Sequence, residues 1–174
     1  MLQSLSYTAG AISVVLGVIY YAFNLRESRR NGRIALANSL IQKVQSPEWH
    51  GITLDLYKQE WSDYDDFEKK YGSDNNPDSY AKRFSVWRYY NSLGYMLKYN
   101  LIDAYSLSNL GDGDAIIFMW NKYESIIKTL RKSYSMGEHW LWGFEYLAGE
   151  MLRVTKIRDP SYNAKGYMKY IPDK

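Results

Sequence analysis

The residue types that most often carry catalysis are few in this sequence and are poorly spaced for it. His50 lies in PEWHG and His139 in GEHWLW, and neither has a glutamate three residues before it. The E-x-x-H pair of ferritin-like metal sites and the H-E-x-x-H motif of zinc enzymes are therefore both absent. The chain has no cysteine, which excludes disulfides, thiolate nucleophiles and iron–sulfur ligands. We expect two surface or packing histidines, with no metal, no cofactor and no catalytic residue.

Two other short segments resemble ligand sites only at first sight. Residues 110–115, LGDGDA, lack the spacing of an EF-hand loop and match neither phosphate-loop motif. A turn followed by Asp114 as a helix N-cap accounts for them. The acidic run Asp63, Asp65 and Asp66 suits a solvated face and the start of a helix capped by Ser62, where negative charge is favourable. The sequence thus predicts a protein that is not an enzyme.

Basic charge at two places is the clearer chemical signal. Residues 26–33 carry four arginines and one glutamate, whereas residues 34–152 carry 12 basic and 16 acidic side chains. Residues 153–174 carry six basic and two acidic side chains. Two basic segments that flank a mildly acidic body suit contact with an anionic surface. The tail residues named for contact with lipid or with an acidic partner are Lys156, Arg158, Lys165 and Lys169, and a solvated tail is the alternative.

A helix with one core face and one solvent face explains the mixed basic and aromatic residues 82–90, KRFSVWRYY. Aromatics make up 17% of the chain, with 18 tyrosines and 6 tryptophans, which favours a folded core over disorder. Because the body is acidic overall, we predict no nucleic-acid partner.

The element that precedes the arginines is an uncharged segment, residues 1–25. Its densest apolar part, residues 7–23 (YTAGAISVVLGVIYYAF), is about 25 Å long as a helix, and residues 2–25 are about 36 Å long. A bilayer core is about 30 Å thick, so the segment predicts a transmembrane helix. A signal peptide and a buried helix of a soluble protein are the alternatives. A signal peptide has its basic charge before the apolar run, and a buried helix rarely ends in RESRRNGR.

Flanking residues predict how this span sits in the bilayer. The residues named as membrane-interface anchors are Tyr7, Tyr20, Tyr21, Arg26, Arg29, Arg30 and Arg33. Tyrosines concentrate at membrane–water interfaces, and arginines stay on the cytoplasmic side. We therefore expect a single-pass protein of the cell membrane, with the N-terminus outside and the C-terminal domain in the cytoplasm.

One face of the predicted span carries small residues. Its helix-packing positions are Ala9, Gly10, Ser13 and Gly17. Small residues four apart let helix backbones approach closely in lipid, although glycine and alanine are also common in such helices without a partner. The face favours a transmembrane protein partner or self-association.

Helical periodicity continues after the arginines. Ile34, Ala37, Ile41 and Val44 continue the first helix, and Ser46-Pro47 and Asn76-Pro77 each predict a cap followed by a new helix. Apolar stripes then follow at residues 86–97, 116–130 and 140–151, and no alternating strand is found. We predict an all-α protein in which the transmembrane helix continues into a small helical bundle of about five or six helices. The predicted parts are an anchor (1–25), a basic juxtamembrane helix (26–45), an all-α domain (46–152) and a basic tail (153–174), of which residues 156–174 are expected to be extended or disordered unless docked.

The arrangement of a span, an Arg-rich run and the segments YAKRFSVWRYYNSLGYMLKYNLIDAYSLSNLGDGDAIIFMWNKYESII and HWLWGFEYLAGEML resembles a family of uncharacterised single-pass prokaryotic membrane proteins with a small helical cytosolic domain. The resemblance covers residues 5–152. It implies packing roles at Phe84, Trp87, Leu93, Leu101, Ile102 and Trp120, and it transfers no catalytic residue. The Tyr- and Lys-rich composition also resembles archaeal proteins, in which chains of this size occur as accessory subunits of membrane enzymes, including ammonia monooxygenase.

These features lead to one expectation of function and two alternatives. We expect a non-catalytic, membrane-anchored interaction protein that serves as an accessory subunit of a larger membrane complex, with the lipid bilayer as its first partner. A membrane-tethered enzyme with an unrecognised site and a self-assembling sensor or adaptor are the alternatives.

Overall fold

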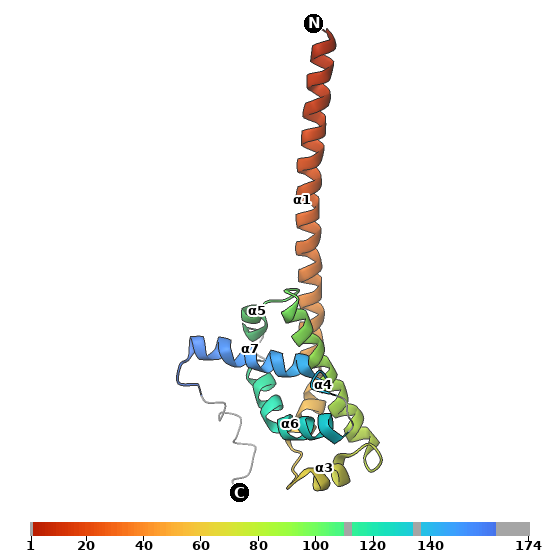
Figure 1. Cartoon of the computed structure of the whole chain (residues 1–174), viewed down its shortest axis with the longest axis vertical. Helices are drawn as coiled ribbons and strands as arrows, with labels where there is room; N and C mark the ends of the chain where they lie inside the picture. Colours follow the sequence, from red (N-terminus) through yellow and green to blue (C-terminus); the bar gives the residue numbers. More distant parts are fainter. Residues whose placement is uncertain (1, 110–112, 134–136, 163–174) are drawn as a thin grey trace. The chain divides into compact units, whose positions relative to one another are not determined.

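The chain is all-α in the computed structural model, which describes residues 2–109, 113–133 and 137–162 (Figure 1). The side chains of residues 2–9, 11, 12, 33, 37 and 41 lie outside this description. Seven helices are found in the described ranges, and they divide into two compact units, Met1–Gln42 and Lys43–Lys174. The all-α part of the predicted fold class is confirmed, with six helices after the first in the described residues.

The first unit consists of most of helix α1, Leu2–Val44. As predicted, the helix continues without interruption from the apolar segment through the arginines, and Gly32 does not break it. In the part of α1 whose side chains are described, every residue from 13 to 32 is exposed. Within the described residues, no helix has a stretch that is long and apolar enough to cross a membrane.

The second unit contains the remaining helices, and two of its predicted caps, Ser46 and Asn76, form as the sequence indicates. The helices are α2 (Pro47–Tyr57), α3 (Tyr64–Tyr71), α4 (Pro77–Lys98), α5 (Ala104–Asn109), α6 (Gly113–Ser133) and α7 (Trp142–Arg158). The Ser46 hydroxyl accepts a hydrogen bond from Trp49 N at 3.1 Å, and the Asn76 side chain accepts one from Ser79 N at 3.1 Å. Each cap satisfies one of the free N–H groups at a helix start.

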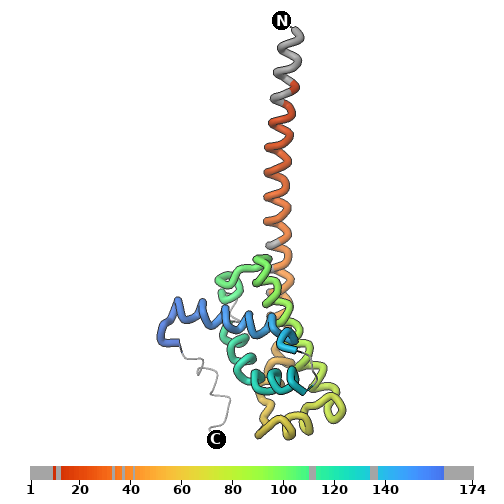
Figure 2. Tube along the Cα trace, viewed as in Figure 1, coloured from red at the N-terminus to blue at the C-terminus, as the bar shows by residue number. Residues whose placement is uncertain are grey.

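Helix α7 packs against both α4 and α6, and these three helices hold most of the core (Figure 2). The predicted stripe of α4 is buried, since Val86, Tyr90 and Leu93 are each at most 2% exposed. The predicted stripes of α6 and α7 face the same core: Ile116, Tyr123, Ile127, Phe144, Leu147 and Met151 are fully buried. Burial of one apolar stripe from each helix stabilises the unit.

Glycine is required where α4 and α7 are closest. A Cβ atom placed on Gly94 would overlap the backbone of Gly143, and one placed on Gly143 would overlap the carbonyl oxygen of Asn91. The Asn91 side chain also accepts a hydrogen bond from Gly143 N at 2.9 Å. This backbone contact fixes which residues of α4 and α7 lie next to each other.

Three local predictions differ from the structure at helix ends. Asp63 rather than Ser62 caps α3. Helix α7 begins at Trp142 instead of Trp140, because the buried Leu141 has a left-handed backbone (φ 56°) that interrupts helical geometry. The prediction of an extended or disordered segment from Lys156 onward is wrong for its first three residues, because α7 continues to Arg158. Pro160 ends it by disfavouring helical backbone at Asp159.

Candidate functional site

The histidines and the acidic run are not brought together into a reactive site. His50 and His139 are both exposed. In the described part of the chain, no three His, Asp or Glu side chains are close enough to hold a metal ion. Of the segment LGDGDA, residues 110–112 lie outside the description, and Asp114 lies in the first turn of α6.

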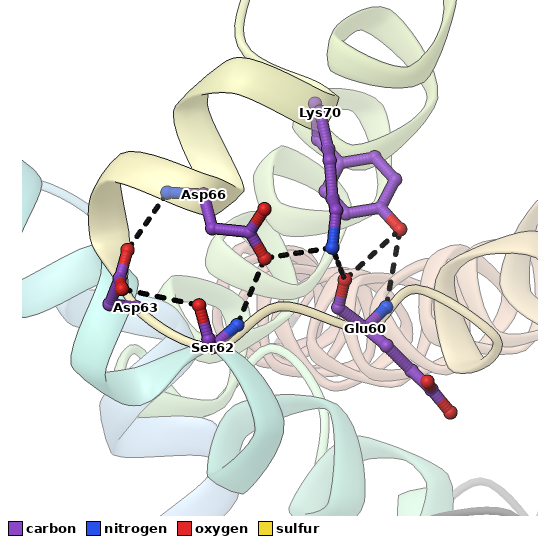
Figure 3. Close-up of polar contacts among 6 residues, drawn as sticks. Glu60, Ser62, Asp63, Asp66 and Lys70 are labelled. Carbon is purple, nitrogen blue, oxygen red and sulfur yellow. Dashed lines mark hydrogen bonds and ion pairs between the residues drawn. The ribbon is translucent and has the colours of Figure 1, made fainter.

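The acidic run stabilises the start of α3, in agreement with the sequence prediction (Figure 3). Asp63 Oδ1 accepts a hydrogen bond from Asp66 N at 2.9 Å, and Asp66 Oδ2 accepts one from Ser62 N at 3.0 Å. Lys70 Nζ lies 2.8 Å from Asp66 Oδ2 and also donates to the carbonyl oxygen of Glu60. The Lys70 hydrogen bond is the main cause of the lowered pKa of Asp66. These carboxylates are engaged as helix caps.

The predicted span residues that the structure describes are all exposed on α1. Gly10 and Gly17 have space for a Cβ atom, with no other atom of the chain within 4 Å. Tyr20 and Tyr21 are 69% and 64% exposed. Ser13, Arg26, Arg29 and Arg30 are also exposed, whereas the side chains of Tyr7, Ala9 and Arg33 lie outside the description.

The four predicted tail contacts have different surroundings. Lys156 is exposed on the last turn of α7. Arg158 extends to α5, where it donates hydrogen bonds to Ser108 Oγ at 3.1 Å and to Asn109 Oδ1 at 2.7 Å. Lys165 and Lys169 lie outside the described residues. Arg158 therefore joins α7 to α5, a contact that the sequence analysis did not anticipate.

A continuous row of aromatic and cationic side chains lies on the surface beside the α4–α7 contact. Tyr95 packs against Trp142 with ring centroids 5.7 Å apart, and Trp142 stacks on Tyr146 at 5.2 Å. The Lys98 ammonium lies 6.0 Å from the Trp142 ring and 5.5 Å from the Tyr146 ring. Tyr99 stacks on Tyr95 at 6.5 Å and is 70% exposed.

The row continues to helix α5. Arg153 is paired with Glu150, and this hydrogen bond is the main cause of its raised pKa, with smaller contributions from Tyr105 and Tyr146. Arg158 then lies 5.7 Å from the Tyr105 ring. We define the aromatic–basic surface by the residues Tyr95, Lys98, Tyr99, Tyr105, Trp142, Tyr146 and Arg158. Tyrosine, tryptophan and arginine, which make up most of this surface, are enriched at binding surfaces.

A second group of the same residue types is buried inside the unit. Its residues, which we call the buried aromatic centre, are Trp61, Phe67, Arg83, Trp87 and Tyr123. Arg83 is 2% exposed, lies 4.6 Å from the Phe67 ring and 5.1 Å from the Trp87 ring, and donates a hydrogen bond to Tyr71 O at 2.8 Å. Burial lowers the pKa of Arg83 and raises that of Tyr123.

Polar groups around this centre are tied to the backbone. The Tyr123 hydroxyl lies 3.1 Å from Leu56 O and 2.8 Å from Gln59 Oε1, and Gln59 in turn donates to Ser79 Oγ. Lys122 Nζ donates to Tyr57 O at 3.1 Å and to Gln59 O at 2.6 Å. These bonds hold the chain between α2 and α3 against α6, which is a structural role.

Two residues, Arg83 and Leu101, lie in surroundings that differ from those that the sequence indicated. Arg83, which lies in the segment read as one core face and one solvent face, is fully inside the protein, because its guanidinium stacks on aromatic rings and donates to a helix-end carbonyl. Leu101, expected to pack, is 51% exposed. It follows Asn100, whose left-handed backbone (φ 56°) turns the chain away from α4.

Comparison with known proteins gives no relative. The chain matches no protein-family model, no curated protein and no solved structure. The aromatic–basic surface and α1 are therefore interpreted from their own chemistry.

Proposed function

We propose that this chain is a membrane-anchored interaction protein that serves as an accessory subunit of a larger membrane complex. The observation that carries the proposal is the exposure of apolar side chains on α1. These residues are Val14, Val15, Leu16, Val18, Ile19 and Phe23, each between 46% and 67% exposed. A helix that is apolar all round requires an apolar environment, and a bilayer provides one for residues 7–23.

The arginines give the proposed orientation. Arg26, Arg29 and Arg30 follow the apolar run directly and are exposed. Under the positive-inside rule they remain in the cytoplasm, together with the helical unit that follows. Because the chain has no cysteine, single cysteines can report this orientation without background labelling. A cysteine at Ser39 should react with an impermeant maleimide only after the membrane is opened, and reaction in intact cells would reverse the orientation.

Partner contact is proposed for the small face of α1. A Cβ atom at Gly17 has no atom within 4 Å apart from the local backbone of α1, so Gly17→Ile should leave the fold intact while blocking a close helix–helix contact. Gly32→Ile is the matched control, because Gly32 is equally open and lies beyond the apolar run. In mild detergent, Gly17→Ile should lose co-purifying membrane subunits and Gly32→Ile should keep them. Equal co-purification would contradict the packing role.

Membrane insertion itself is tested by a charge in the middle of the run. The apolar residues of residues 7–23 together favour insertion by about 2–4 kcal/mol, and one central arginine opposes it by about 3 kcal/mol. Val15→Arg should therefore move much of the chain into the alkaline-carbonate-soluble fraction. Leu54→Arg is the control, since Leu54 is also an exposed apolar residue but lies on α2. If both variants stay in the membrane, or if the unaltered chain is soluble in carbonate, the anchor proposal fails.

A further inference from the structure

We propose that the second unit binds the surface of an anionic bilayer through exposed apolar side chains around the aromatic–basic surface. Tyr99 is 70% exposed, Leu101 51%, Tyr105 46% and Ile157 56%. The first three lie on the short path from the end of α4 through α5, and Arg158 connects α5 to the end of α7, next to Ile157. This inference rests on the proposed membrane anchor and adds a second, separate membrane contact.

Local charges favour phosphate headgroups as the partner. Among the described residues, no carboxylate lies within ion-pair distance of Lys98 or Lys156 (all described pairs involve other cations). The neighbouring carboxylates are already engaged: Glu150 pairs with Arg153, Asp103 accepts from Ser106 N, and Asp159 accepts from Ser161 N. Lys98, which precedes the exposed Tyr99, and Lys156, which precedes the exposed Ile157, therefore match an anionic headgroup layer.

Exposed tyrosine, leucine and isoleucine side chains at the ends of α4 and α7 and on α5 also suit the boundary between headgroups and acyl chains. An acidic protein could pair with the lysines, whereas a bilayer surface offers both phosphate headgroups and an apolar layer beneath them. Tyrosine rings with a polar hydroxyl and an apolar body occupy membrane interfaces for this reason. Each lysine near such a surface contributes roughly a fivefold change in affinity.

The test uses the full chain in nanodiscs, with one engineered cysteine that carries a fluorophore. In Leu101→Cys, the label should be protected from acrylamide in nanodiscs that contain phosphatidylglycerol and exposed in nanodiscs of phosphatidylcholine alone. In Leu54→Cys, the control on α2, the label should be equally accessible in both lipids. The double variant Lys98→Glu/Lys156→Glu should reduce the protection at position 101 severalfold, whereas Lys58→Glu/Lys69→Glu, at exposed sites on other parts of the unit, should not.

Each other outcome overturns the inference. Equal quenching at positions 101 and 54 in the anionic nanodiscs would show that the second unit does not touch the bilayer. Protection that is unchanged in phosphatidylcholine, or that survives the charge reversal, would remove the assignment to anionic lipid. Protection that arises only with a co-purified subunit would assign the surface to a protein. A chain that fails to enter nanodiscs at all contradicts the anchor proposal instead.

Discussion

The buried aromatic centre and the aromatic–basic surface are made of the same residue types in two different environments. In the centre, Arg83 lies against Phe67 and Trp87 and donates to a backbone carbonyl. On the surface, Lys98 lies at a similar distance from Trp142 and Tyr146, but it is exposed and has no ion-pair partner among the described residues. This difference shows that residue type alone does not distinguish a structural cluster from a binding surface. The two are distinguished by whether the side chains are buried and whether they form hydrogen bonds to the backbone.

The largest effect is expected inside the centre. Tyr123→Ala removes a fully buried ring that contacts Trp61, Trp87 and the polar group of Gln59, and it should destabilise the protein by about 3–5 kcal/mol. Tyr146→Ala is the surface counterpart and should cost less than about 1 kcal/mol. Urea unfolding followed by tryptophan fluorescence measures both values. Similar losses for the two variants would contradict the division into a structural centre and a binding surface.

The next effect concerns the helix contact that positions both regions. Gly94→Ala places a methyl group against the backbone of Gly143, which cannot move aside as a side chain would. We expect a loss of about 1–3 kcal/mol, together with a changed spacing between Tyr95 and Trp142. Gly149→Ala is the control on the same helix pair, because its Cβ meets no atom within 4 Å and alanine favours a helix by up to about 1 kcal/mol. A stable Gly94→Ala protein would refute the close approach.

Periodicity was sufficient to predict the fold class because the stripes of α4, α6 and α7 have regular helical spacing. The caps at Ser46 and Asn76 could also be predicted, since each precedes a proline at the first helical position. The end of α7 could not be predicted in the same way. Lys156 and Arg158 suggested a polar tail, and Val154 was the only residue that continued the buried stripe. One residue in a charged context is too weak a signal for a helix boundary.

The aromatic–basic surface was only partly predictable. Arg158 was named from the charge of the tail, but Lys98, Trp142 and Tyr146 lie on two helices far apart in sequence. Their contact depends on the Gly94–Gly143 approach, which no local pattern reveals. Arg83 shows the opposite difficulty, since its neighbours Lys82 and Arg88 suggested a solvent-facing cation. Only the three-dimensional contacts show that its guanidinium is inside.

A smaller effect is a pH dependence of stability that arises in the buried aromatic centre. Burial raises the pKa of Tyr123 in the folded protein, so its contribution to stability is complete below the unfolded value of about 10 and is lost as the pH rises further. The stability of the unaltered protein relative to Tyr123→Phe should fall by about 1 kcal/mol between about pH 9.5 and 11.

This comparison with Tyr123→Phe also separates the tyrosine from Lys122. Burial lowers the pKa of Lys122, so its contribution to stability rises over the same alkaline range and partly offsets that of Tyr123. Both proteins keep Lys122, and the difference between them reports Tyr123 alone. Denaturant unfolding at several pH values measures it. A pH-independent difference for Tyr123→Phe would mean that its hydroxyl is solvated.

The smallest effect on stability, and the most informative for function, is expected at Lys98. Lys122 and Lys98 each lie over a tryptophan ring, at 5.0 Å from Trp61 and 6.0 Å from Trp142. Lys122→Gln removes a charged donor from two backbone carbonyls and should cost about 1.5–3 kcal/mol. Lys98→Gln removes an exposed cation and should change stability by less than about 0.5 kcal/mol. Urea unfolding measures both values. If the loss of unfolding free energy for Lys98→Gln is close to that for Lys122→Gln, Lys98 has a structural role, which contradicts its proposed contact with an anionic partner.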